Sequence, residues 1–185
     1  MGFLSLLLIA VGLSMDAFAV SVAKGLAVAN VRPRHALLAG VWFGGFQALM
    51  PVVGYLLASS FSAIVVSIDH WIAFALLSFI GLNMIREAVW GDEESGDENF
   101  GPRKMFLMAV ATSIDALAVG VSMAFIGVDI VAAALSIGVV TFLFSFAGIY
   151  LGRSVGSKLG KKAGVLGGIV LIFIGIKILI EHLSE

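Results

Sequence analysis

Long apolar runs separated by short polar breaks are the dominant pattern along this chain. Six runs stand out, and they cover approximately residues 2–27, 36–59, 66–88, 104–126, 129–151 and 163–182. Each is long enough for a helix that crosses about 30 Å of hydrocarbon at 1.5 Å per residue. The runs lack the apolar–polar alternation of outer-membrane barrel strands. The pattern therefore predicts an all-α polytopic membrane protein with six transmembrane helices.

The composition indicates that lipid is the main solvent of the chain. Of the 185 residues, 61% are hydrophobic and 12% are charged, against about 45–50% and about 25% in soluble domains. Six helices fill the length, so no soluble catalytic domain is expected. The absence of cysteine excludes disulfides and thiolate metal sites. The first run continues past Asp16 without a preceding positive charge, so we interpret it as a retained helix rather than a signal peptide.

Among the connections between the runs, only alternate ones carry positive charge. Lysines and arginines occur in the first connection, with which Lys24 is counted, and in the third and fifth, whereas none occurs in the second and fourth. Connections rich in lysine and arginine remain in the cytoplasm. The pattern predicts that both chain termini lie outside the cytoplasm.

The two halves of the chain share a repeated sequence. Ser14–Val20 matches Ser113–Val119 at five of seven positions, and residues 79–87 resemble 173–181. Because each copy holds three predicted helices, the second copy must enter the membrane in the opposite orientation. Inverted repeats of this kind are common in secondary transporters.

The repeat also divides the chain into domains. We predict a first three-helix repeat over residues 1–90, an acidic cytoplasmic linker over 91–103 and a second, inverted three-helix repeat over 104–185. The acidic segment Gly91–Asn99 is rich in turn-forming residues, which is typical of a solvated connection.

One aspartate lies near the middle of the first run, and another lies at the matched position of the fourth. These residues are Asp16 and Asp115. A charged carboxylate at the bilayer centre costs about 2.5–3.5 kcal/mol on insertion scales, so each must face the bundle interior or a water-filled cavity. Two carboxylates facing one cavity would neutralise a divalent cation and supply hard oxygen ligands. The alternative is a structural aspartate that caps a helix break or pairs with lysine.

Polar side chains near the aspartates are further candidates for ligands, supporting groups or gate elements. Ser14 and Ser113 precede the aspartates by two residues, and Thr112 is adjacent, although such hydroxyls more often bond to the preceding helical turn. In the second run, Pro51 removes the hydrogen bond to the carbonyl of Gln47. That carbonyl and the Gln47 amide could bind a cation, unless the proline only kinks a packed helix.

The third and sixth runs carry Asn83 and Lys177 at matched positions, followed by Glu87 and Glu181 one turn later. Lys177 and Glu181 have the spacing of a helical ion pair. Lys177 would then extend to the membrane surface or pair there. Alternatively, it is a tethered cation that competes with substrate for a carboxylate.

Three motifs resemble those of a known family. Gly12–Ser21, Gly44–Gly54 and Ala111–Gly120 are closely similar to the MntP family of bacterial manganese efflux pumps, which is related to the LysE-type exporters of amino acids and cadmium. The resemblance covers essentially the whole chain. It implies a transporter, not an enzyme, that has no cofactor and exports Mn²⁺ across the bacterial inner membrane in metal homeostasis. It further implies that Asp16 and Asp115 are the metal residues.

The residues alone leave other functions open. They indicate a secondary-active transporter of a divalent cation or small solute, so an exporter of Cd²⁺, another divalent cation or an amino acid remains an alternative. An intramembrane aspartyl protease also needs two membrane aspartates, but its Gly-x-Gly-Asp and Tyr-Asp signatures are absent. The expected partners are a divalent metal ion and the lipid bilayer, with no nucleic acid; the sequence predicts no particular oligomeric state.

Overall fold

Helices make up nearly all of the described part of this chain. The computed structural model describes the backbone of residues 3–28, 31–90, 100–126 and 128–159 and of parts of 165–180. Within these ranges it describes most of the side chains, but none of those in residues 59–73. The helices are α1 (Phe3–Ala27), α2 (Pro33–Trp90), α3 (Pro102–Thr112), α4 (Ile114–Ile126) and α5 (Ile130–Leu159). The predicted all-α class is therefore confirmed.

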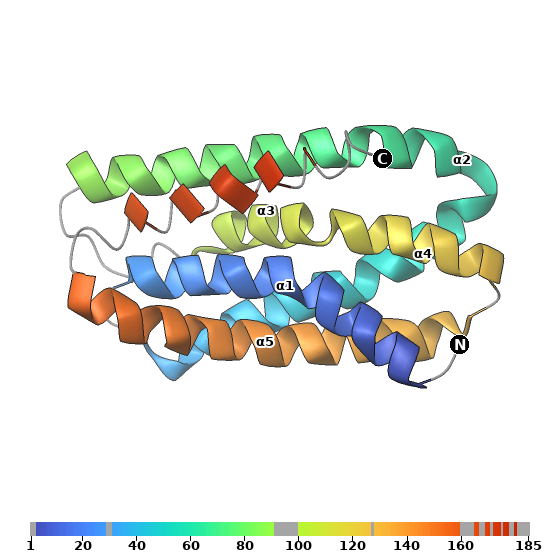
Figure 1. Cartoon of the computed structure of the whole chain (residues 1–185), viewed down its shortest axis with the longest axis horizontal. Helices are drawn as coiled ribbons and strands as arrows, with labels where there is room; N and C mark the ends of the chain where they lie inside the picture. Colours follow the sequence, from blue (N-terminus) through green and yellow to red (C-terminus); the bar gives the residue numbers. More distant parts are fainter. Residues whose placement is uncertain are drawn as a thin grey trace.

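The helices lie lengthwise in one elongated bundle (Figure 1). In that view α1 and α5 run side by side from right to left, whereas α3 and α4 run from left to right. The most extensive packing joins α1 to α5 and α2 to both α5 and α4. Helices from the two halves of the sequence are thus packed against each other.

The second and third predicted helices form a single helix. The sequence predicts separate helices over 36–59 and 66–88, but α2 comprises 58 residues. Figure 1 shows that α2 turns back on itself at the right-hand end of the bundle and returns along the top. The segment between the predicted helices contains neither proline nor glycine, so the helical hydrogen bonding has no intrinsic reason to end there.

The fourth predicted helix is broken. The sequence predicts one run over 104–126, but α3 and α4 meet at Ser113 with a bend of 43°. The Ser113 Oγ donates a hydrogen bond to the Ala109 carbonyl at 2.6 Å, and the Thr112 Oγ1 donates to the Met108 carbonyl at 3.0 Å. Hydroxyls that bond to the preceding turn bend helices.

Several helices are long and apolar enough to cross a membrane. In the part of the chain described, Leu4–Ala27, Pro33–Ala58 and Ile130–Val155 meet this condition, and the bent pair α3–α4 adds a fourth span if it crosses as one unit. Large apolar side chains such as Leu8, Leu56 and Leu143 point outward, as expected for surfaces in contact with lipid. The fold is that of a multi-pass membrane protein.

Glycines allow matched helices of the two halves to touch through their backbones. A Cβ at Gly54 of α2 would collide with the Leu117 carbonyl of α4, and a Cβ at Gly148 of α5 would lie 2.9 Å from the Phe18 carbonyl of α1. Gly54 corresponds to Gly148 in the repeat, and Leu117 corresponds to Phe18. The same glycine-to-carbonyl contact therefore occurs twice, once between α2 and α4 and once between α5 and α1.

Gly44 of α2 and Gly138 of α5 face each other at the contact between these two helices. A Cβ at Gly44 would lie 2.7 Å from the Gly138 carbonyl, and a Cβ at Gly138 would lie 3.0 Å from the Gly44 carbonyl. The two glycines occupy equivalent positions, three residues before Gln47 and Thr141. Each of these glycines thus meets its counterpart from the other half of the sequence.

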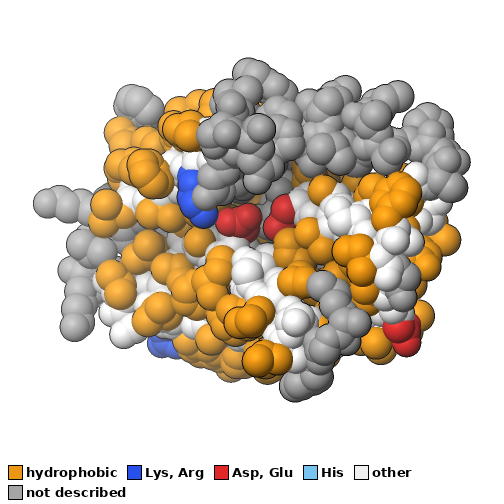
Figure 2. Space-filling model, turned by 45° about the vertical axis from the view of Figure 1, so that its right-hand side comes forward, with side chains coloured by type: hydrophobic (Ala, Val, Ile, Leu, Met, Phe, Trp, Pro, Cys, Tyr) orange, Lys and Arg blue, Asp and Glu red, His pale blue; other side chains and the backbone are white. Residues whose placement is uncertain are grey.

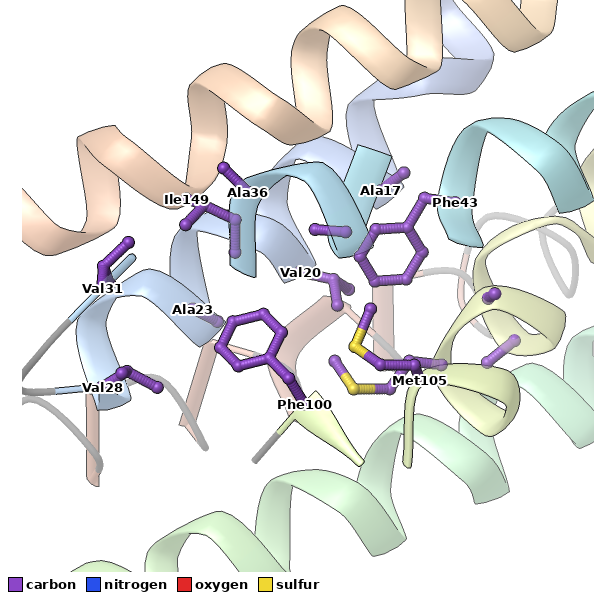
Figure 3. Packing of buried hydrophobic residues seen from close by; sticks show 14 of the residues in the cluster. Ala17, Val20, Ala23, Val28, Val31, Ala36, Phe43, Phe100, Met105 and Ile149 are labelled. Carbon is purple, nitrogen blue, oxygen red and sulfur yellow. The ribbon is translucent and has the colours of Figure 1, made fainter. Parts of the chain in front are cut away.

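The larger buried core lies where α1 ends and α2 and α3 begin. Figure 3 shows the rings of Phe43 and Phe100 and the side chain of Met105 beside Val20 and Ala23 of α1. A second, smaller cluster consists of Ala10, Met123, Ala133 and Ile137. The two clusters lie on opposite sides of Asp16 along α1.

Candidate functional site

The structure brings Asp16 and Asp115 together. Asp16 lies in the middle of α1, and Asp115 lies in the first turn of α4. Both are half-buried, and their carboxyl groups are close enough to interact electrostatically. Two neighbouring carboxylates repel each other unless a cation or proton lies between them.

The break between α3 and α4 provides a favourable environment for Asp115. Its Oδ1 accepts a hydrogen bond from the backbone N–H of Ala116 at 2.7 Å, and the N-terminus of a helix carries a partial positive charge. The Gln47 side chain is close enough to Asp115 to interact with its carboxyl group. The sequence placed Asp115 in the interior of a continuous helix, whereas the structure places it at a helix N-terminus.

Gln47 connects the two helices that carry the aspartates. Its Nε2 donates a hydrogen bond to the Leu13 carbonyl of α1 at 2.9 Å, and its side chain is fully buried. Its Oε1 has no hydrogen-bond partner among the described residues. A buried oxygen without a partner costs about 1–3 kcal/mol, and a bound cation would satisfy it.

Thr141 occupies the position in the second half that corresponds to Gln47. The Oγ1 of Thr141 lies 2.8 Å from the Oγ of Ser14, which also donates to the Ala10 carbonyl at 2.6 Å. An amide thus joins α2 to α1, and a pair of hydroxyls joins α5 to α1. The surroundings of the aspartates are therefore asymmetric.

The other predicted residues lie in different surroundings. The Thr112 and Ser113 hydroxyls donate to α3 carbonyls at the helix break. Pro51 is buried within α2, where its carbonyl would collide with a Cβ at Gly120 of α4. Lys177 is exposed. The side chains of Asn83, Glu87 and Glu181 lie outside the described residues.

Acidic side chains lie next to one another on one face of the molecule. Figure 2 shows them next to one another in a hollow near the middle of this face, with a basic side chain beside them and hydrophobic side chains around. Within the described ranges, no group of three or more histidine, cysteine, aspartate or glutamate residues could hold a metal ion. A cation bound here would need further oxygen atoms from amides, carbonyls or water.

The prediction that Lys24 lies in a connection was wrong. Lys24 lies in the last turn of α1 and is only 2% exposed. Its Nζ lies 5.4 Å from the centroid of the Phe100 ring, and a cation over an aromatic face is stabilised when it is desolvated. The position of Lys24 at the end of an apolar run was the signal that could have indicated burial.

Comparison with known proteins gives the same family over most or all of the chain. The family Mntp, described as "Putative manganese efflux pump", matches residues 30–179. A protein of Desulfitobacterium hafniense (strain Y51) named "Putative manganese efflux pump MntP" is 54% identical over 184 residues, covering 100% of this chain and 97% of that protein.

Proteins of two other bacteria carry the same name. One from Acetivibrio thermocellus is 52% identical and covers 100% of this chain and 93% of that protein. One from Mannheimia succiniciproducens is 48% identical and covers 98% of both chains. No solved structure matches this chain. The family match and these full-length identities show that the chain belongs to the Mntp family of membrane transporters, whose members are not enzymes.

Proposed function

We propose that this protein exports Mn²⁺ from the cytoplasm by secondary-active transport, with Asp16 and Asp115 holding the ion inside the membrane. The observation that carries the proposal is the pairing of these carboxylates beside the unpartnered Oε1 of Gln47. The relatives are named as manganese efflux pumps, and this name supports Mn²⁺ as the cargo.

The donor set suits a hard divalent cation. Two carboxylates neutralise the charge of Mn²⁺, and the Gln47 Oε1 adds a neutral oxygen. Mn²⁺ prefers octahedral oxygen coordination, so water or backbone carbonyls would complete the shell. An ion that retains part of its hydration binds less tightly and is released more readily, which transport requires.

The proposed architecture is six transmembrane helices in two inverted repeats. Residues 1–90 and 104–185 form the repeats, and 91–103 form a cytoplasmic linker. The opposite directions of α1 and α3–α4 in Figure 1 support this arrangement, as do the matched glycine contacts. Two similar halves can exchange conformations, which would open the central site to one side of the membrane and then to the other.

The distribution of basic residues supports the proposed orientation. One end of the bundle, here called the basic end, is where α1 and α5 finish and α2 and α3 begin (Figure 1). These termini carry Lys24, Arg32, Arg34, Arg103, Lys104 and Arg153. We assign the basic end to the cytoplasm of a bacterial inner membrane and both chain termini to the opposite side.

Export requires an energy source, and the sequence contains no nucleotide-binding motif. Moving two positive charges out of a cell costs about 4.6 kcal/mol per 100 mV of membrane potential. We propose that protons entering in exchange supply this work. The carboxylates that release Mn²⁺ to the outside would take up protons there, because a protonated carboxylate is a poor ligand.

Purified protein in proteoliposomes tests both cargo and coupling. Mn²⁺, Cd²⁺ and lysine are offered in turn at the cytoplasmic face, under an imposed pH gradient or an imposed Na⁺ gradient. We expect Mn²⁺ transport that accelerates when the face corresponding to the cell exterior is acid, with protons moving in the opposite direction. Transport of lysine alone would overturn the proposed cargo, and acceleration by Na⁺ but not by pH would overturn proton coupling.

A further inference from the structure

A positive charge is buried between the proposed metal site and the cytoplasm. Lys24 follows Asp16 by eight residues on α1, which places it about 12 Å further along the helix axis toward the basic end. Its side chain is fully enclosed although ammonium groups are strongly hydrated. The proposed transport mechanism gives this residue no role at the metal site.

Phe100 is held between Lys24 and His35. Its ring is stacked on the His35 imidazole with centroids 4.5 Å apart and planes inclined by 5°, and the Lys24 ammonium lies 5.4 Å from its centroid. The His35 ring is itself oriented by a hydrogen bond from the Arg32 backbone N–H to Nδ1 at 3.3 Å. Phe100 immediately precedes α3 and is only 5% exposed, so three separate segments meet at one ring.

The path from this ring to Asp16 is closed by packed side chains. Ala17, Val20 and Ala23 of α1 are fully buried, and so are Met105 and Met108 of α3. Figure 3 shows Phe100 and Met105 against Val20 and Ala23. Among the described residues, this cluster fills the space between Phe100 and Asp16 along the contact of α1 with α3.

We propose that Phe100, stacked on His35 and covering the Lys24 ammonium, is the cytoplasmic gate of the transport path. The proposal rests on the proposed function only in assigning a path through Asp16. With Phe100 in place, its ring and the apolar side chains beneath it close the path beside the buried Lys24 ammonium. When Phe100 withdraws, the Lys24 ammonium loses its contact with the aromatic face.

The gate belongs to one end of the molecule. The position in the second half that corresponds to Lys24 is Met123, which lies in the smaller apolar cluster on the other side of the aspartates. Opening at the opposite end therefore requires no displacement of a buried charge at this position. The two halves share a fold, but among the described residues a buried ammonium occupies this position only at the cytoplasmic end.

Thiol labelling measures the gate directly, because the chain has no native cysteine. Ala23→Cys reports on the closed path, and Ala10→Cys, in the other apolar cluster, serves as the control; both alanines are fully buried. Everted membrane vesicles expose the cytoplasmic face to an impermeant thiol reagent. We expect Phe100→Leu to raise the labelling rate of Ala23→Cys roughly tenfold, because leucine keeps the apolar character and removes the aromatic face, with little change at Ala10→Cys.

Two further variants separate the gate from general loosening. Phe100→Trp retains an aromatic face and should keep labelling of Ala23→Cys near its original rate. Phe106→Leu, on the exposed face of α3, should do the same. Unchanged labelling of Ala23→Cys in a folded Phe100→Leu protein would overturn the gate, and so would equal increases at both reporters. Labelling requires no cargo, so a failure of Mn²⁺ transport would refute the proposed function without changing this readout.

Discussion

Gln47 contacts one aspartate-bearing helix and lies near the aspartate of the other. It donates to the Leu13 carbonyl one turn before Asp16 and is close enough to Asp115 to interact with its carboxyl group. Either aspartate alone could be mispositioned by a small helix rotation. The amide fixes the two relative to each other and leaves an oxygen available for a cation.

Replacement of this amide should weaken metal binding without unfolding the protein. Gln47→Leu conserves approximate volume, leaves the Leu13 carbonyl without its donor and removes a candidate ligand. We expect the KM for Mn²⁺ to rise roughly tenfold, in line with about 1–3 kcal/mol for an unsatisfied buried group. The measurement is Mn²⁺ transport as a function of concentration.

Thr141→Val is the matched control for Gln47→Leu. It is nearly isosteric and removes the hydroxyl partner of Ser14, while Ser14 keeps its bond to the Ala10 carbonyl. Its KM should change much less than that of Gln47→Leu. Equal effects of the two substitutions would show that Gln47 has only a packing role.

The apolar runs predicted that helices form better than they predicted where the helices begin and end. The predicted and observed helices agree where several polar residues or glycines separate two runs. The break at Ser113 was missed because it arises from two hydroxyls that bond back to α3 carbonyls, and serine or threonine occurs in many unbroken helices. The continuity of α2 was missed because a change of direction need not interrupt helical hydrogen bonding.

In the candidate site, likewise, the sequence identified the aspartates but not the contacts around them. The repeated Ser-x-Asp-Ala motif was sufficient to select Asp16 and Asp115, because a charged residue inside an apolar run is costly. The contacts of Gln47 with Leu13 and Asp115 depend on how α2 crosses two other helices. The burial of Lys24 likewise depends on Phe100, which is distant in sequence.

Close helix crossings predict a specific sensitivity to added side-chain volume. Gly120→Ala places a Cβ against the Pro51 carbonyl, which is backbone and cannot rotate away. We expect this substitution to destabilise the protein by about 1–3 kcal/mol, measured as a lower thermal unfolding midpoint in detergent. Gly45→Ala should be neutral or stabilising, since nothing lies within 4 Å of its added Cβ and alanine favours helix. Equal stability of the two variants would contradict the proposed tight crossing.

For the whole molecule, the charge asymmetry makes the orientation testable. A cysteine at Val128, in the connection between α4 and α5, should react with an impermeant reagent in intact spheroplasts. A cysteine at Arg103, at the basic end, should react only in everted vesicles. The reverse pattern would place the basic end outside and contradict the proposed direction of export.

The transport account as a whole depends on a charge-neutralising pair shared between the two halves. Its most direct test is Mn²⁺ uptake into everted vesicles that contain Asp16→Asn, Asp115→Asn or Asp129→Asn. The last is the control, because Asp129 is exposed and accepts hydrogen bonds from Val131 and Ala132 at the start of α5, and asparagine caps a helix equally well. We predict that either Asp16→Asn or Asp115→Asn reduces uptake to background, since asparagine keeps the shape but not the charge, and that Asp129→Asn transports normally. Uptake at the unmodified rate by both Asp16→Asn and Asp115→Asn, at equal protein levels, would contradict the two-aspartate site.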